Sequence, residues 1–106
     1  MKLVLSTIPP KDAKSMARTL VNERLVACVN IVPMVESIYW WKGEVCEDAE
    51  SLMIMKTTAA LVPRLLDRIR SLHSYEVPEI VSLDIDENGS NPDYVKWVMA
   101  SVAGPS

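Results

Sequence analysis

The sequence predicts the α+β class, and within it a ferredoxin-like βαββαβ sandwich with one long β-hairpin and an additional C-terminal helix. Three observations predict this fold. Short apolar stretches alternate with two segments of helical periodicity, the dipeptide Lys42-Gly43 divides one long strand-like stretch into a hairpin, and an amphipathic segment follows at the end. Because 106 residues provide one hydrophobic core, we expect a single domain over residues 1–106.

The first third of the chain predicts a strand, a helix and a second strand. Residues 3–8 form an apolar run that ends at a proline pair, which is typical of a buried strand. Over about residues 11–25, apolar side chains recur at i, i+3 and i+4, which predicts an amphipathic helix. Residues 26–32 predict a second strand that continues past Pro33. Since proline has no N–H to donate, Pro33 must lie at an edge or a bulge.

The middle of the chain predicts the hairpin and a second helix. A strand over residues 35–41 reverses at Lys42-Gly43, where glycine permits a tight turn, and returns over residues 44–57. A helix follows over about residues 60–72. We expect its buried side to carry Leu61, Leu65, Leu66, Ile69 and Leu72.

The last third predicts an irregular link over residues 73–79, a fourth strand over residues 80–85 and a turn at Asn88-Gly89. A final helix then begins with Asn91 as its cap and Pro92 in its first turn, and it stops at Gly104-Pro105. We expect its buried stripe to consist of Tyr94, Trp97, Val98 and Val102.

Composition excludes several classes of function. Eleven Lys+Arg and fourteen Asp+Glu give a net charge of −3 without a basic run, so neither nucleic acid nor a membrane is expected as a partner. Two cysteines and one histidine are too few for a tetrahedral zinc site within one chain. The isolated glycines form no phosphate-binding loop, and a Ser-His-Asp arrangement is not evident, so we expect no enzyme. Without an export signal we expect a cytoplasmic protein with reduced thiols.

The hairpin register separates the two cysteines. With the turn at Lys42-Gly43, Tyr39 faces Cys46, whereas Cys28 lies near Thr57 at the other end of the ribbon. At about 3.3 Å per residue the thiols are tens of ångströms apart, so we expect no intrachain disulfide.

The hairpin also carries aromatic side chains on both faces, because residues 38–41 read Ile-Tyr-Trp-Trp and strand side chains alternate. A hairpin that projects beyond its helices cannot bury both faces alone. We therefore expect association, most simply with further copies of the chain. The alternative is that the helices cover one face and tryptophan partly shields the other.

Two polar residues are candidates for ligand chemistry. His73 ends a helix beside Tyr75 and Glu79, and it is either a metal ligand shared between copies or a structural histidine. Lys56 interrupts an apolar strand, so it either forms a salt bridge, with Glu79 as the expected partner, or lines a pocket.

The hairpin also contains an acidic stretch. Because Glu44, Glu47, Asp48 and Glu50 lack the spacing of a calcium loop, we expect a solvated strand edge.

Several segments together form a specific pattern: residues 23–33 (ERLVACVNIVP), 37–43 (SIYWWKG), 55–57 (MKT) and 73–80 (HSYEVPEI), completed by Tyr94 and Trp97. In order and spacing they resemble the CutA divalent-cation tolerance family. The resemblance implies a ferredoxin-like homotrimer with hairpins packed around a threefold axis, similar in architecture to trimeric nitrogen-regulatory signalling proteins.

The resemblance also implies a role in tolerance of copper or other divalent cations. In a bacterial member, copper ligation is attributed to a cysteine at the end of the first strand and to paired histidines at the end of the second helix. The corresponding residues here are Ser6, Leu72 and His73, so that only His73 matches. Ser74 also replaces a proline that usually follows this histidine.

The leading hypothesis is a non-enzymatic homotrimer that binds Cu²⁺, another divalent cation or a small ligand in clefts between subunits. We expect Trp41, Lys56, Tyr75 and Glu79 near these clefts, with His73 as the metal ligand. Alternatives are an adaptor trimer that anchors a partner protein and a signalling trimer. An acylphosphatase-like enzyme would need an arginine loop after the first strand, where residues 8–11 read Ile-Pro-Pro-Lys instead.

Overall fold

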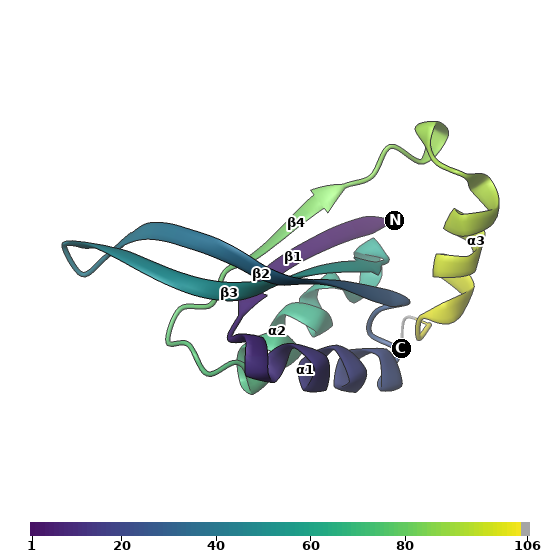
Figure 1. Ribbon diagram of the computed structural model, residues 1–106. Coiled ribbons are helices and arrows are strands. Elements are labelled where there is room, and N and C mark those ends of the chain that lie inside the picture. Colours follow the sequence, from purple (N-terminus) through teal and green to yellow (C-terminus); the bar gives the residue numbers. More distant parts are fainter. Residues whose placement is uncertain (105–106) are drawn as a thin grey trace.

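The computed structural model describes residues 1–104 and confirms the predicted fold. Its seven main elements are β1 (Lys2–Ile8), α1 (Pro10–Asn22), β2 (Cys28–Trp41), β3 (Glu44–Thr57), α2 (Val62–Leu72), β4 (Ile80–Asp84) and α3 (Pro92–Ser101). The strands form an antiparallel sheet in the order β2-β3-β1-β4. Helices α1 and α2 lie on one face of this sheet, the β2–β3 hairpin extends beyond them, and α3 lies at the opposite end (Figure 1).

The hairpin has the predicted register on the distal side of a bulge. Tyr39 pairs with Cys46, and the register shifts between Val32 and Val35, around Pro33. As a result Cys28 pairs with Lys56 rather than with Thr57. The bulge leaves the Pro33 carbonyl outside the ladder, where the Ser51 hydroxyl donates to it at 2.7 Å. Both cysteines are free thiols.

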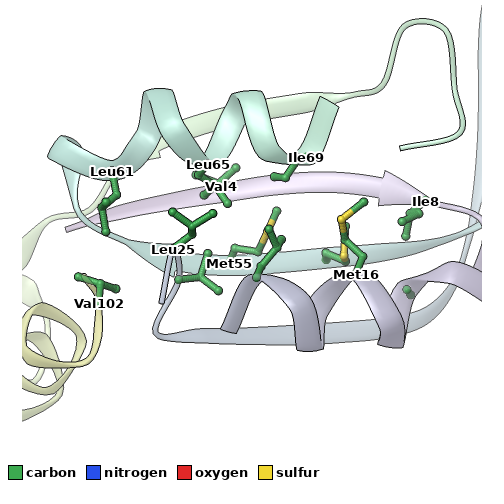
Figure 2. Packing of buried hydrophobic residues seen from close by; sticks show 13 residues of the cluster. Val4, Ile8, Met16, Leu25, Met55, Leu61, Leu65, Ile69 and Val102 are labelled. Carbon is green, nitrogen blue, oxygen red and sulfur yellow. The ribbon is translucent and has the colours of Figure 1, made fainter. Parts of the chain in front are cut away.

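The core lies between the sheet and the two helices. Alternate residues of β1 and β3 point toward α1 and α2, and Figure 2 shows how their side chains meet those of the helices. The innermost residues, each 0–2% exposed, include Val4, Ile8, Leu20, Met53, Met55, Leu65 and Ile69. Burying each such side chain stabilises the fold by about 1.5–3 kcal/mol.

Helix α1 ends at Asn22, three residues earlier than the periodicity predicts, because Arg24 adopts a left-handed conformation with φ 59°. The Arg24 N–H donates to the Val21 carbonyl, and the Leu25 N–H donates to the Leu20 carbonyl. This pattern is a Schellman motif, and the buried side chains of Leu20 and Leu25 belong to the same core. The motif turns the chain sharply, so β2 begins at Cys28 rather than at residue 26.

Two of the side chains that were predicted to be buried in helix α3 are exposed. Val98 and Val102 are buried as expected, but Tyr94 is 38% and Trp97 48% exposed. The reason is its place at the end of the sheet, where only one side of the helix meets the domain (Figure 1). The Asn91 cap is confirmed by its Oδ1, which accepts from the Asp93 N–H at 3.0 Å. The helix ends at Ser101, before Gly104; Pro105 lies outside the described residues.

The second face of the sheet is largely apolar and faces away from α1 and α2. The register places on this face Leu3, Leu5, Val32, Leu52, Ile54, Val81 and Leu83, together with Thr7, Cys28, Asn30 and Lys56. Val81 and Leu83 are 47% and 46% exposed. We call this set the open face. Within residues 1–104, none of the helices has the length and apolar character needed to cross a membrane.

Candidate functional site

A cavity of about 770 Å³ lies where the hairpin leaves the body of the domain. Its walls come from β2, from Glu50 of β3, from Thr7 of β1 and from the link between α2 and β4. Three of the predicted site residues line it, namely Trp41, Tyr75 and Glu79. These three residues come from the hairpin and from the link, which thus form two walls of one cavity within the chain.

His73 contacts two residues of the cavity lining, Thr7 and Tyr75, and is buried, with 9% of its surface exposed. Its Nε2 is 2.8 Å from the Thr7 carbonyl oxygen, and its Nδ1 accepts a hydrogen bond from the Tyr75 N–H at 3.1 Å. Because Nδ1 accepts, the proton of the neutral ring is on Nε2, which donates to Thr7. The imidazole ring also contacts the Tyr75 ring at a centroid distance of 4.6 Å. His73 thus fixes the start of the link and orients Tyr75.

Tyr75 covers a buried carboxylate. Its hydroxyl donates to Glu50 Oε2 at 2.9 Å, and Glu50 is only 5% exposed. Burial and this bond raise the pKa of Tyr75, so the phenol remains a neutral donor at physiological pH. The prediction of a solvated edge is wrong for Glu50, because the link folds over the hairpin at this residue.

A second phenol forms a similar pair farther along the hairpin. The Tyr39 hydroxyl donates to Asp48 from the neighbouring strand, and this bond raises the pKa of Tyr39 to about 12. Tyr39 also lines the cavity, together with Glu36. The sequence held a usable signal for this pair, because the predicted register places Tyr39 diagonally opposite Asp48.

The hairpin tip carries a lysine whose ammonium group lies near the cavity. Lys42 and Gly43 both have positive φ, 49° and 81°, which confirms the predicted turn. The Lys42 ammonium lies 5.6 Å from the centroid of the Trp41 ring and 3.8 Å from Glu76 Oε2. Trp41 and Glu76 both line the cavity, whereas Lys42 is exposed to solvent.

Lys56 lies elsewhere, and its predicted pairing with Glu79 is wrong. Lys56 pairs with Leu3 near the start of β1, whereas β4 begins beside Ser6 near the end of β1. Strands β3 and β4 are both antiparallel to β1. The end of β3 therefore lies beside the start of β1, the start of β4 lies beside the end of β1, and the two are at opposite ends of the sheet. Lys56 instead donates to Asn30 and lies 4.0 Å from the Cys28 sulfur.

The residues at the copper-ligand positions do not form a copper site within one chain. The Ser6 hydroxyl is fully buried and donates to the Glu79 carbonyl at 2.7 Å, while Leu72 is exposed and apolar. Both ring nitrogens of His73 already have partners. Across the described part of the chain, no group of three or more His, Cys, Asp or Glu side chains is arranged to hold a metal ion. Metal ligation by His73 stays a prediction.

Comparison with known proteins identifies the family. The family model described as CutA1 divalent ion tolerance protein matches residues 2–101. The chain belongs to the CutA1 family. The divalent-cation tolerance protein CutA of Thermus thermophilus is 50% identical over 98 residues, which cover 92% of this chain and 93% of that protein.

Other relatives are longer than this CutA1 family member. Human protein CutA is 51% identical over 88 residues, which cover 83% of this chain but 48% of that protein, so the chain spans about half of its length. Among solved structures, the PII-like protein CutA from Nostoc sp. PCC 7120 in apo form superposes with a TM-score of 0.92 at 44% identity. That match covers 97% of this chain and 98% of the other.

Proposed function

We propose that this CutA1 family member is a non-enzymatic homotrimer that serves divalent-cation tolerance, copper included. It acts by binding metal ions or small ligands in clefts between subunits. The observation that carries the proposal is the cavity at the hairpin root, where Trp41, Tyr75 and Glu79 meet. We place the protein in the cytoplasm, where Cys28 and Cys46 remain reduced.

The open face supports association. A sheet with helices on one side only leaves apolar side chains in contact with water on the other, and this face includes Val81 and Leu83, each nearly half exposed. Exposed Trp40 and Ile38 add apolar surface on the opposite face of the hairpin, because they pair with Val45 and Glu47, which alternate onto the side of Met53. Three copies that turn their open faces toward one axis bury these faces and bring each hairpin against a neighbouring subunit.

The place of the cavity supports ligand binding between subunits. It lies at the foot of the hairpin, so a hairpin that packs on a neighbour carries one wall of the cavity to the subunit boundary. In a trimer the single His73 becomes three, and carboxylates such as Glu79 become available from two chains. Metal ligation by His73 then requires that a metal replace the Thr7 carbonyl at Nε2.

Titration calorimetry with Cu²⁺ and with Zn²⁺, combined with light scattering on the same samples, tests the proposal. We expect a trimeric mass and a heat of binding that His73→Ala abolishes. The matched variant His73→Gln retains hydrogen-bonding groups and controls for damage to the fold. A monomeric mass would contradict the assembly. Identical isotherms for wild type and both variants would remove His73 from the metal site.

A second candidate, an adaptor trimer, is favoured by exposed side chains of α3. The rings of Tyr94 and Trp97 lie with centroids 5.5 Å apart, and both residues are exposed, as is Met99. Aromatic side chains and methionine are enriched at protein interfaces. A third candidate, a signalling trimer, draws on the PII-like description of the Nostoc structure. If the adaptor role holds, Trp97→Ser leaves the trimer intact and removes binding of its partner protein.

A further inference from the structure

We propose that the cavity at the hairpin root takes a small organic cation, namely a primary ammonium compound held between the Trp41 ring and the glutamates of the cavity. This inference rests on the proposed function and names the class of ligand for the same site. It follows from the charge of the cavity walls, from the position of Lys42 and from the burial of Glu50.

The walls of the cavity combine negative charge with aromatic faces. Four glutamates line it, at positions 36, 50, 76 and 79, and three aromatic side chains accompany them, Tyr39, Trp41 and Tyr75. Among residues 1–104, the lining includes no lysine, arginine or histidine. Carboxylates and the faces of aromatic rings both attract cations and repel anions. The cavity therefore selects a positively charged ligand.

The chain itself shows how an ammonium group is held here. The Lys42 ammonium lies between the Trp41 ring, at 5.6 Å from its centroid, and Glu76 Oε2, at 3.8 Å. Lys42 reaches this position from the exposed hairpin tip, so it stands at the mouth of the cavity rather than inside it. A free alkylammonium ion can form the same two contacts, and Lys42 then competes with it.

Glu50 presents a nearly buried carboxyl group to the cavity. It is 5% exposed, and its Oε2 accepts from the Tyr75 hydroxyl. Within the described residues no buried side-chain oxygen lacks a partner, so Oε1, for which no donor is found, is reached by solvent. Glu50 also forms no ion pair within residues 1–104. A buried carboxylate is stable only when charges or donors compensate it. Because Glu50 lines the cavity, a cationic ligand is placed to provide that compensation.

The arrangement suits an organic cation better than a bare metal ion. A divalent metal ion requires several oxygen or nitrogen ligands at about 2.0–2.6 Å from one point. The described residues contain no such convergent group. The glutamates instead lie around a cavity of about 770 Å³ with aromatic walls, which can accommodate an alkyl chain and present a carboxylate to each end of a diamine.

Calorimetry with 1,4-diaminobutane tests the inference, with 1,4-butanediol as the uncharged control of equal shape. We expect the diamine to bind and the diol not to bind. Trp41→Leu keeps an apolar side chain but removes the ring, and it weakens the diamine affinity about tenfold. Glu79→Gln removes one charge from an exposed wall and weakens the affinity as well. Equal affinities of diamine and diol, or unchanged affinity in both variants, would overturn the inference.

The Lys42→Met variant provides the most discriminating comparison, because removal of the competing ammonium should strengthen diamine binding several-fold. Its matched control is Lys96→Met, which removes the same charge from exposed α3 at the far end of the molecule and leaves the affinity unchanged. Equal effects of both variants would mean that net charge alone determines the diamine affinity, and they would overturn the inference. Light scattering separates the two proposals: a trimer without diamine binding overturns this inference alone, and a monomer overturns the proposed assembly.

Discussion

The bond between Tyr75 and Glu50 allows a quantitative test of how the link closes on the hairpin. Tyr75→Phe removes the hydroxyl that donates to Glu50 Oε2 at 2.9 Å and leaves the carboxylate without that donor. Loss of the donor to a buried polar acceptor costs about 1–3 kcal/mol. Because Tyr75 is itself 36% exposed, water replaces part of the bond, and we expect a loss of about 1 kcal/mol, the lower end of this range.

The assay is denaturation by guanidinium at fixed protein concentration, in a double-mutant cycle with Glu50→Ala. If the hydroxyl stabilises the fold through Glu50, Tyr75→Phe costs about 1 kcal/mol in the wild type and much less in the Glu50→Ala background. Tyr39→Phe is the control, since it removes a similar bond from an exposed pair and should cost less. An equal loss from Tyr75→Phe in both backgrounds would show that the hydroxyl does not stabilise the fold through Glu50.

Three further predictions concern other parts of the molecule. Arg24→Gly should stabilise the protein by about 0.5–1 kcal/mol in thermal unfolding, because glycine adopts φ 59° without the cost that a side chain imposes; a lower melting temperature would contradict this. Tyr39 should ionise at about pH 12, so its contribution to stability is present below pH 10 and is lost as the pH rises toward 12; ultraviolet titration of wild type against Tyr39→Phe should show the missing step there. Ser6→Ala should loosen the start of β4 by removing the bond to the Glu79 carbonyl, which amide hydrogen exchange of residues 79–81 can detect; unchanged exchange would contradict it.

The sequence predicted the hairpin well because its register depends on one local feature. Once the turn is placed at Lys42-Gly43, alternation determines which residues face each other up to the bulge at Pro33. The end of α1 was predicted less well, because the Schellman motif uses Arg24 where glycine is the usual signal.

The candidate site was predicted in part because its residues come from segments that meet only in three dimensions. Trp41, Tyr75 and Glu79 are found in one cavity, but Glu50 was missed because its burial depends on the link folding over it. Lys56 was misplaced because strand direction, and not proximity in sequence, decides which strand ends meet. Periodicity likewise marked Tyr94 and Trp97 as apolar, but it cannot tell burial within one chain from burial against another.

We propose that the open face and the hairpin hold three chains together, and sedimentation equilibrium measures this assembly. We expect the wild type to have three times the 11.8 kDa mass of the chain over a wide concentration range. Leu83→Lys places a charge on the open face and should shift this mass toward the monomer, whereas Lys14→Glu on the exposed side of α1 should leave it unchanged. A wild-type mass of one chain, or a trimer that Leu83→Lys does not weaken, would rule out assembly through the open face.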